Sequence, residues 1–274
     1  MRIDRRRGRI YVRRRGPCPA LWLVLALVMA LAAFVFFARP AIQSVSVNLG
    51  EAPASGARVT REVRFADLSA HLVELARTSD QAQARVEAAR YVARGAAGYV
   101  LTDEAGSAVI GNAYDRAEDA RKVKENLLEA EKIEARVRCV AAPGLTLRIT
   151  GTDAQMGALT GGEDALRALT GALSAHALAL DQAEVEPLLI RAALSIEAEE
   201  AERARARLAA AAGATPNPVA ETWMGLLDRL KAACEKLSRD EQATPLTFSS
   251  QIKYAFVDMR LAHIAALAQL AGGG

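Results

Sequence analysis

The sequence predicts an α+β protein with an N-terminal single transmembrane helix, a βαββαβ sheet domain and then a C-terminal α-helical bundle. Residues 20–38 form an unbroken apolar run, residues 63–151 alternate between strand-like and helix-like patterns, and residues 152–271 place apolar side chains at helical spacing. A basic stub over residues 1–19 and a linker over residues 39–62 complete the predicted division.

The apolar run from Ala20 to Ala38 contains no charged residue. A helix rises about 1.5 Å per residue, so about 20 apolar residues cross the roughly 30 Å hydrocarbon core of a bilayer. Eight arginines and one aspartate precede the run, and Arg39 is the only base close behind it. This asymmetry favours a cytosolic N-terminus. We therefore expect a single-pass protein of the plasma membrane, with the residues after Pro40 outside the cytosol.

A cleaved signal peptide is the alternative interpretation of the same run. Cleavage after Ala38 would place Phe36 at the third-last position, where the peptidase requires a small residue. The run is also longer than most signal-peptide cores, which favours an uncleaved anchor. Cys18 precedes the run, whereas the cysteine of a lipoprotein follows it.

The basic pI of the chain does not point to a nucleic-acid partner. The formal net charge is +3, but residues 1–16 alone carry +7, so the other 258 residues sum to −4. The basic pI therefore comes from the stub, whose arginines we expect to control topology, and contact with anionic lipid is the alternative. Two cysteines follow the apolar run, Cys139 and Cys234. They are able to pair, although two cysteines outside a small disulfide scaffold are more often buried and free.

In the sheet half, apolar alternation and turn residues predict the elements one by one. A strand with an irregular start runs through Val63 and Phe65 and then through Leu72, Val73 and Leu75. Ser79 or Asp80 caps the helix after it. Asp115, with Glu118 three residues on, predicts a capping box for the second helix. The helix that Ser79 or Asp80 caps covers residues 82–93. The remaining strands cover residues 98–102, 108–114, 134–140 and 145–150. Residues 44–49 alternate like a short strand, but we interpret this region mainly as linker.

The second half is predicted to be helical throughout. Its helices cover residues 163–180, 184–211, 219–237 and 249–270, with breaks at 213–218 and at Pro245. The mixed charges of residues 197–207 indicate a solvated helix face, and a partner surface is the alternative.

The sheet half resembles the SPOR-domain (sporulation-related repeat) family, over about 80 of the 274 residues. The first strand of that family contains Val-Gln-Val-Gly, where this chain has Val73, Glu74, Leu75 and Ala76. The third strand of the family is matched by Val109, Gly111, Asn112 and Tyr114. Glu118, Asp119 and Ala120 then open a helix as in the family. The aromatic side chains usual on the sheet are replaced by Ser107 and Ala108.

The resemblance implies a membrane-anchored protein that binds peptidoglycan glycan strands stripped of stem peptides, at division or sporulation septa. Strand alternation indicates the face on which a ligand would lie. If Val73, Leu75, Val109, Val137 and Cys139 face the helices, the opposite face carries Ala108, Ile110 and the four candidate ligand-binding residues Glu74, Asn112, Arg136 and Arg138. Those four side chains offer hydrogen bonds to sugar hydroxyls and N-acetyl groups. The alternative is that they solvate an open sheet, or that the helical half covers it. Tyr99 and Tyr114 are interpreted as edge or core aromatics rather than as stacking platforms.

The motifs of catalysis are not found. The three histidines, His71, His176 and His263, have no carboxylate or cysteine at motif spacing, and zinc requires three or four N or S ligands. We therefore expect no enzyme activity, no metal and no cofactor. Two hypotheses remain. The protein is a wall-binding protein of the SPOR type, or it is a structural protein whose outer helical bundle docks another envelope or divisome protein.

Overall fold

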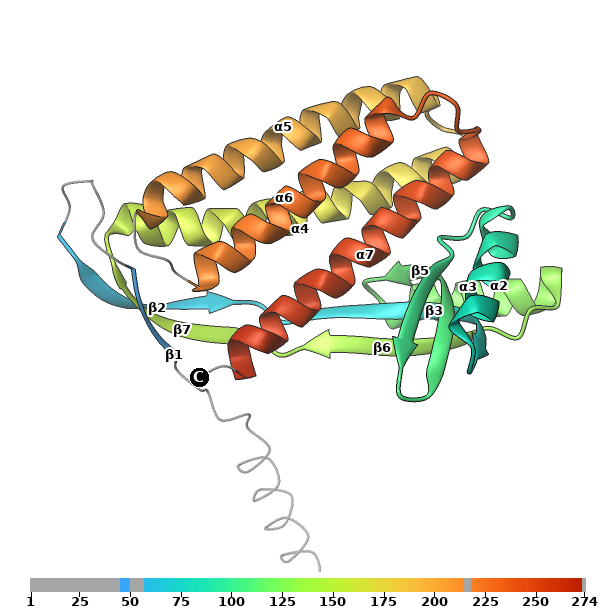
Figure 1. The fold of residues 1–274 in the computed structure, drawn as a ribbon, viewed down its shortest axis with the longest axis horizontal. Coiled ribbons are helices and arrows are strands. Elements are labelled where there is room, and N and C mark those ends of the chain that lie inside the picture. The colour runs from blue at the N-terminus through green and yellow to red at the C-terminus, as the bar shows by residue number, and fades with distance from the viewer. Residues whose placement is uncertain (1–44, 50–56, 214–217, 273–274) are drawn as a thin grey trace, which may run out of the picture. The chain divides into compact units, whose positions relative to one another are not determined.

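The computed structural model describes residues 45–49, 57–213 and 218–272. Contacts divide the chain into two units, Met1–Ile42 and Gln43–Gly274, and the described residues all belong to the second unit. The described part of this unit is α+β, with six helices and two small sheets (Figure 1). The basic stub and the apolar run lie outside the described residues.

The larger sheet is antiparallel, and its strand order is β4-β5-β3-β6. Its strands are β3 (Leu68–Thr78), β4 (Tyr99–Asp103), β5 (Gly106–Tyr114) and β6 (Arg136–Ala142). The helices α2 (Gln81–Val92) and α3 (Ala117–Glu131) pack on one face of it. The order strand, helix, strand, strand, helix, strand is that of a ferredoxin-like unit.

The smaller sheet has the order β1-β7-β2 and consists of β1 (Val45–Asn48), β2 (Val59–Phe65) and β7 (Leu145–Gly151). It continues the larger sheet (Figure 1). Strand β2 leads directly into β3, and β6 leads directly into β7. These two long segments pair with each other in both sheets, as β2 with β7 and as β3 with β6. The pairing of these two segments is interrupted at residues 66–67, which lie opposite residues 143–144. Pro143 has no N–H to give to a ladder, and a Cβ on Gly144 would lie 3.1 Å from the carbonyl oxygen of Phe65. Strands β1 and β2 thus occupy part of the range predicted as linker.

Several predicted helix starts differ from the structure, and two of them have a clear cause. The helix predicted from Glu163 is α4 (Asp153–Asp181), which begins earlier because Thr152 and Gln155 form a reciprocal capping box, with bonds of 3.2 and 2.9 Å. Conversely, Asp115 does not cap α3. The N-cap is Arg116, which makes no side-chain cap bond, and the Asp115 carboxylate pairs instead with Arg260.

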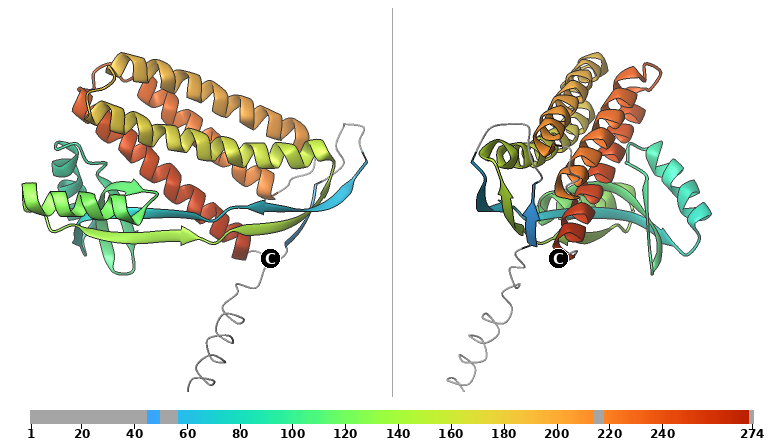
Figure 2. Two further views of the ribbon diagram at one scale, coloured as in Figure 1. Left: turned by 180° about the vertical axis from the view of Figure 1, so that it is seen from behind. Right: turned by 60° about the vertical axis from the view of Figure 1, so that its left-hand side comes forward.

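The remaining helices are α5 (Pro187–Ala212), α6 (Pro218–Arg239) and α7 (Pro245–Gly272), which form a bundle with α4. Helix α7 contacts α4 and α6 on one side and all four strands of the larger sheet on the other (Figures 1 and 2). The buried Lys253 fixes this position, because its Nζ lies 2.6 Å from Asp181 Oδ2 and donates to Gly95 O at 2.7 Å. A single large hydrophobic core accordingly joins both sheets to the bundle.

The predicted α+β class is confirmed, but the predicted arrangement of its parts is wrong. The sheets and the bundle belong to one compact unit and share one core, rather than forming a sheet domain followed by a helical bundle. In the part of the chain that the structure describes, no helix combines the length and the apolar character that a membrane crossing needs.

Candidate functional site

The face of the larger sheet that was expected to be open is covered over much of its area by α7. Leu72, Ala108 and Ile110 lie on this face and belong to the large core shared with the bundle. Ser107, at the other position where the sequence lacks a sheet aromatic, is also buried. The covering arises because α7 is apolar on most of its circumference, so it buries one side against the bundle and the other against the sheet.

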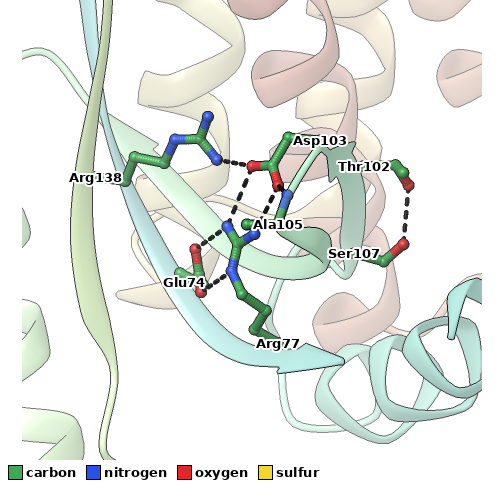
Figure 3. Close-up of polar contacts among 7 residues, drawn as sticks. All are labelled: Glu74, Arg77, Thr102, Asp103, Ala105, Ser107 and Arg138. Carbon is green, nitrogen blue, oxygen red and sulfur yellow. Dashed lines mark hydrogen bonds and ion pairs between the residues drawn. The ribbon is translucent and has the colours of Figure 1, made fainter. Parts of the chain in front are cut away.

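Beyond α7, a cluster of four charged side chains spans this face of the sheet (Figure 3). We call Glu74, Arg77, Asp103 and Arg138 the charged cluster. Arg77 donates from Nε and Nη2 to the two carboxylate oxygens of Glu74, at 2.9 Å each, and from Nη1 to Asp103 Oδ1 at 2.8 Å. Arg138 Nη1 donates to Asp103 Oδ2. The cluster thus links β3, the end of β4 and β6.

A bulge in β3 places Glu74 and Arg77 on the same face. Glu74 pairs with Ile110, the register then shifts, and Arg77 pairs with Ala108. Ile110 and Ala108 both belong to the core on the α7 side. Simple alternation would put residues three apart on opposite faces. For this reason the sequence indicated Glu74 but missed Arg77. It also missed Asp103, which ends β4.

The charges of the cluster neutralise one another. Hydrogen bonds from Arg77, and then from Arg138, hold the pKa of the Asp103 carboxyl well below its usual range. The bonds to Glu74 and Asp103 raise the pKa of Arg77 above its ordinary value. Asp103 therefore stays ionised and is unsuited to move a proton near neutral pH. The cluster offers fixed hydrogen-bonding groups rather than acid–base chemistry.

Arg136 lies at the margin of the cluster and is exposed. It pairs across the ladder with Glu74. Glu74, Arg77, Glu134 and Arg136 line a hollow of about 360 Å³ between the start of β6 and the bulge of β3. Three of the four predicted ligand-binding residues, Glu74, Arg136 and Arg138, therefore come together at the uncovered end of the sheet.

Asn112 is the exception, because it lies on the opposite face. It pairs with Val73, whose side chain packs beside Ala120 of α3, and its Nδ2 lies 3.4 Å from the Tyr114 hydroxyl. The register shift between Val73 and Glu74 leaves Gly111 as the extra residue of β5. Simple alternation predicted Asn112 and Ile110 on the same face of the sheet, and the extra residue places them on opposite faces. The predicted orientation of Asn112 is wrong.

Other reactive groups are dispersed. His176 Nε2 lies 2.7 Å from Glu197 Oε1 between α4 and α5, and His263 lies in the core near α4. Cys139 is exposed and Cys234 is buried, and both are free thiols. Burial raises the pKa of the Cys234 thiol to about 12, which disfavours the thiolate. Within the described ranges, no group of three or more His, Cys, Asp or Glu side chains is arranged to hold a metal ion.

Comparison of the chain with protein-family models, with curated proteins and with solved structures finds no match.

Proposed function

We propose that the protein binds peptidoglycan glycan strands outside the cytosol, in the manner of SPOR-domain proteins, during cell division or sporulation. The observation that carries the proposal is the hollow beside Arg136 at the uncovered end of the ferredoxin-like sheet. Around it, Glu74, Glu134 and two arginines offer both acceptors and donors, which sugar hydroxyls and N-acetyl groups require. A glycan strand lying along this end of the sheet meets these groups without displacing α7.

Replacing Arg136 and Arg138 together with alanine should weaken the retention of the full-length protein on purified peptidoglycan by a few-fold to tens-fold. This range follows from the loss of one or two hydrogen bonds of about 1 kcal/mol each. Thermal stability should change little, because Arg138 pairs with Asp103 near the surface and exposed ion pairs contribute about 0–1 kcal/mol. Co-sedimentation, with and without amidase treatment of the peptidoglycan, measures the effect.

The matched control replaces Arg64 and Arg148, two exposed arginines of the smaller sheet, with alanine. This control removes the same charge from a surface away from the hollow, so it should leave retention unchanged. Equal losses in both double variants would mean that retention reflects net charge alone, and the hollow would then not be the site.

The proposal places the unit Gln43–Gly274 on the outer side of the membrane, on the basis of the charge asymmetry around residues 20–38. An alkaline phosphatase fused after Gly274 should therefore be active, and replacement of most arginines before Pro17 by neutral residues should scramble the orientation. An inactive phosphatase together with an active cytosolic reporter at the same position would contradict both the location and the ligand.

A second function, the docking of another envelope protein, is favoured by one specific observation. Helix α5 exposes three large apolar side chains, Leu188 at 73 %, Leu189 at 62 % and Ile196 at 57 %. Leu188 and Leu189 border a groove of about 1450 Å³ between α5 and α6. Clustered apolar exposure of this kind marks interaction surfaces in soluble units.

Replacing Leu188 and Leu189 with glutamate distinguishes the two functions in cells. Under the docking hypothesis, a fluorescent fusion of this variant should lose its septal position, whereas the Arg136 and Arg138 variant should keep it. Under glycan binding the result should be reversed. Deleting residues 153–274 is not a useful test, because α7 completes the core of the sheet.

A further inference from the structure

A third hollowed surface lies where α6 and α7 approach the connection between α2 and β4. It consists of two adjoining hollows of about 370 and 400 Å³, which share Val92, Ala97 and Tyr254 in their walls. We call this surface the Tyr254 groove. Its combined size falls in the range of sites for small ligands. It is separate from the hollow beside Arg136, because the two share no lining residue.

Tyr254 presents an aromatic ring at the junction of the two hollows. The residue is 47 % exposed, and its ring lies against Tyr99 with a centroid separation of 5.1 Å and an interplanar angle of 49°. Tyr99 is thereby held in place, and burial raises the pKa of its hydroxyl, with a further contribution from the neighbouring Asp258 carboxylate. An exposed ring with such a rigid support is a ready stacking surface.

Fixed polar groups stand beside this ring. In the first hollow, Asp258 is held by Arg229, whose Nε donates to Oδ2 at 2.9 Å, and Asp240 accepts from Gln251 Nε2 at 2.9 Å. The backbone amides of Gln242 and Ala243 also donate to Asp240, at 3.2 Å each. Pre-oriented carboxylates of this kind accept hydrogen bonds without an ordering cost. The polar groups of both hollows include donors as well, namely Lys236 in the first and Gln81 and Arg85 in the second.

We propose that the Tyr254 groove binds an N-acetylated saccharide, one pyranose ring of which stacks on Tyr254. The apolar C–H face of a pyranose matches the ring, and its hydroxyl and amide N–H groups match the carboxylates of Asp240 and Asp258. This inference deepens the proposed function, on which it rests for the identity of the sugar, by assigning a second contact with the same glycan. The competing occupant is an extended peptide that adds to the edge strand β4. Such a peptide would leave the Tyr254 ring and the carboxylates of Asp240 and Asp258 without a role.

The test titrates the full-length protein in detergent with the soluble tetramer of N-acetylglucosamine, by calorimetry. We expect the wild type to bind, Tyr254→Ala to bind about tenfold more weakly, and Tyr254→Phe to bind as the wild type does, because the ring is retained. Thermal melting of all three proteins shows whether they are folded. Asp258→Asn, which keeps the size of the side chain but removes its charge, should also weaken binding.

Two results would overturn the inference. One is a wild type that does not bind the tetramer, and the other is a folded Tyr254→Ala variant with unchanged affinity. Displacement of the tetramer by a peptide of the sequence of β2, but not by a scrambled peptide, would assign the groove to the peptide occupant. Co-sedimentation with peptidoglycan judges the proposed function separately. If wild-type retention persists while the Tyr254 groove fails its test, only this inference falls.

Discussion

Replacing Trp223 with alanine should destabilise the protein by about 3–5 kcal/mol, the cost of deleting a large buried aromatic side chain. Trp223 is fully buried on α6. Its ring lies 5.6 Å from that of Phe65 on β2 and 5.4 Å from that of His263 on α7, measured between centroids. The side chain thus joins the smaller sheet to the bundle. Because a folded domain is typically stable by only about 5–15 kcal/mol, this one substitution should remove a large part of the total.

Urea denaturation followed by circular dichroism measures the change. Trp223→Phe is the matched control, since it keeps an aromatic ring, and Nε1 has no hydrogen-bond partner among the described residues. It should therefore cost much less than Trp223→Ala. A Trp223→Ala variant that loses less than about 1 kcal/mol would show that the bundle and the smaller sheet are stabilised independently of this contact.

The second large effect is a loss of stability in acid that depends on His263. Burial, followed by the charges of Arg167 and Arg260, lowers the pKa of this imidazole to about 4 from an ordinary value of 6.5. Between these values the unfolded chain takes up a proton that the folded protein does not. The free energy of unfolding should therefore fall as pH decreases from about 7 to 4, by up to roughly 3 kcal/mol from this group.

His263→Leu isolates this contribution, because leucine fills much of the same space and does not titrate. The nearest acid is Glu163, whose Oε1 lies 3.7 Å from His263 Nε2, and it is engaged by Arg167. The variant should be at least as stable as the wild type at pH 5, with a visibly shallower dependence of unfolding free energy on pH. Parallel pH profiles for the two proteins would rule out His263 as the source of the acid sensitivity.

Local signals in the sequence are sufficient for most helices and for several strand faces. Asp80 caps α2 as one of the two expected residues, accepting from the amide of Ala82. The predicted inward positions of Val73, Leu75 and Val137 are confirmed, since all three pack beside Ala120. These features depend on residues close together in the chain, so pattern and capping chemistry are enough to find them.

The candidate site was only partly accessible from the sequence. Arg77 and Asp103 form the centre of the charged cluster, but they lie 26 positions apart in the chain and meet through a bulge. A bulge is decided by how two strands pair, so a single strand does not reveal it. A separate register shift, between Val73 and Glu74, turned Asn112 to the opposite face. Tyr254 lies within a helix predicted from the sequence, but its place between two hollows and its contact with Tyr99 depend on elements distant in the chain.

The sequence by itself determined the charge asymmetry around the apolar run, the α+β class and most of the local elements, because each of these depends on residues close together in the chain. Only the tertiary structure decided that β1 and β2 join a second sheet and that α7 lies across the first. Apolar side chains lie on several sides of α7, so periodicity identifies no single buried face. The surfaces that α7 buries depend on residues more than a hundred positions away in the chain. One of them is Gly95, whose carbonyl oxygen accepts a hydrogen bond from Lys253.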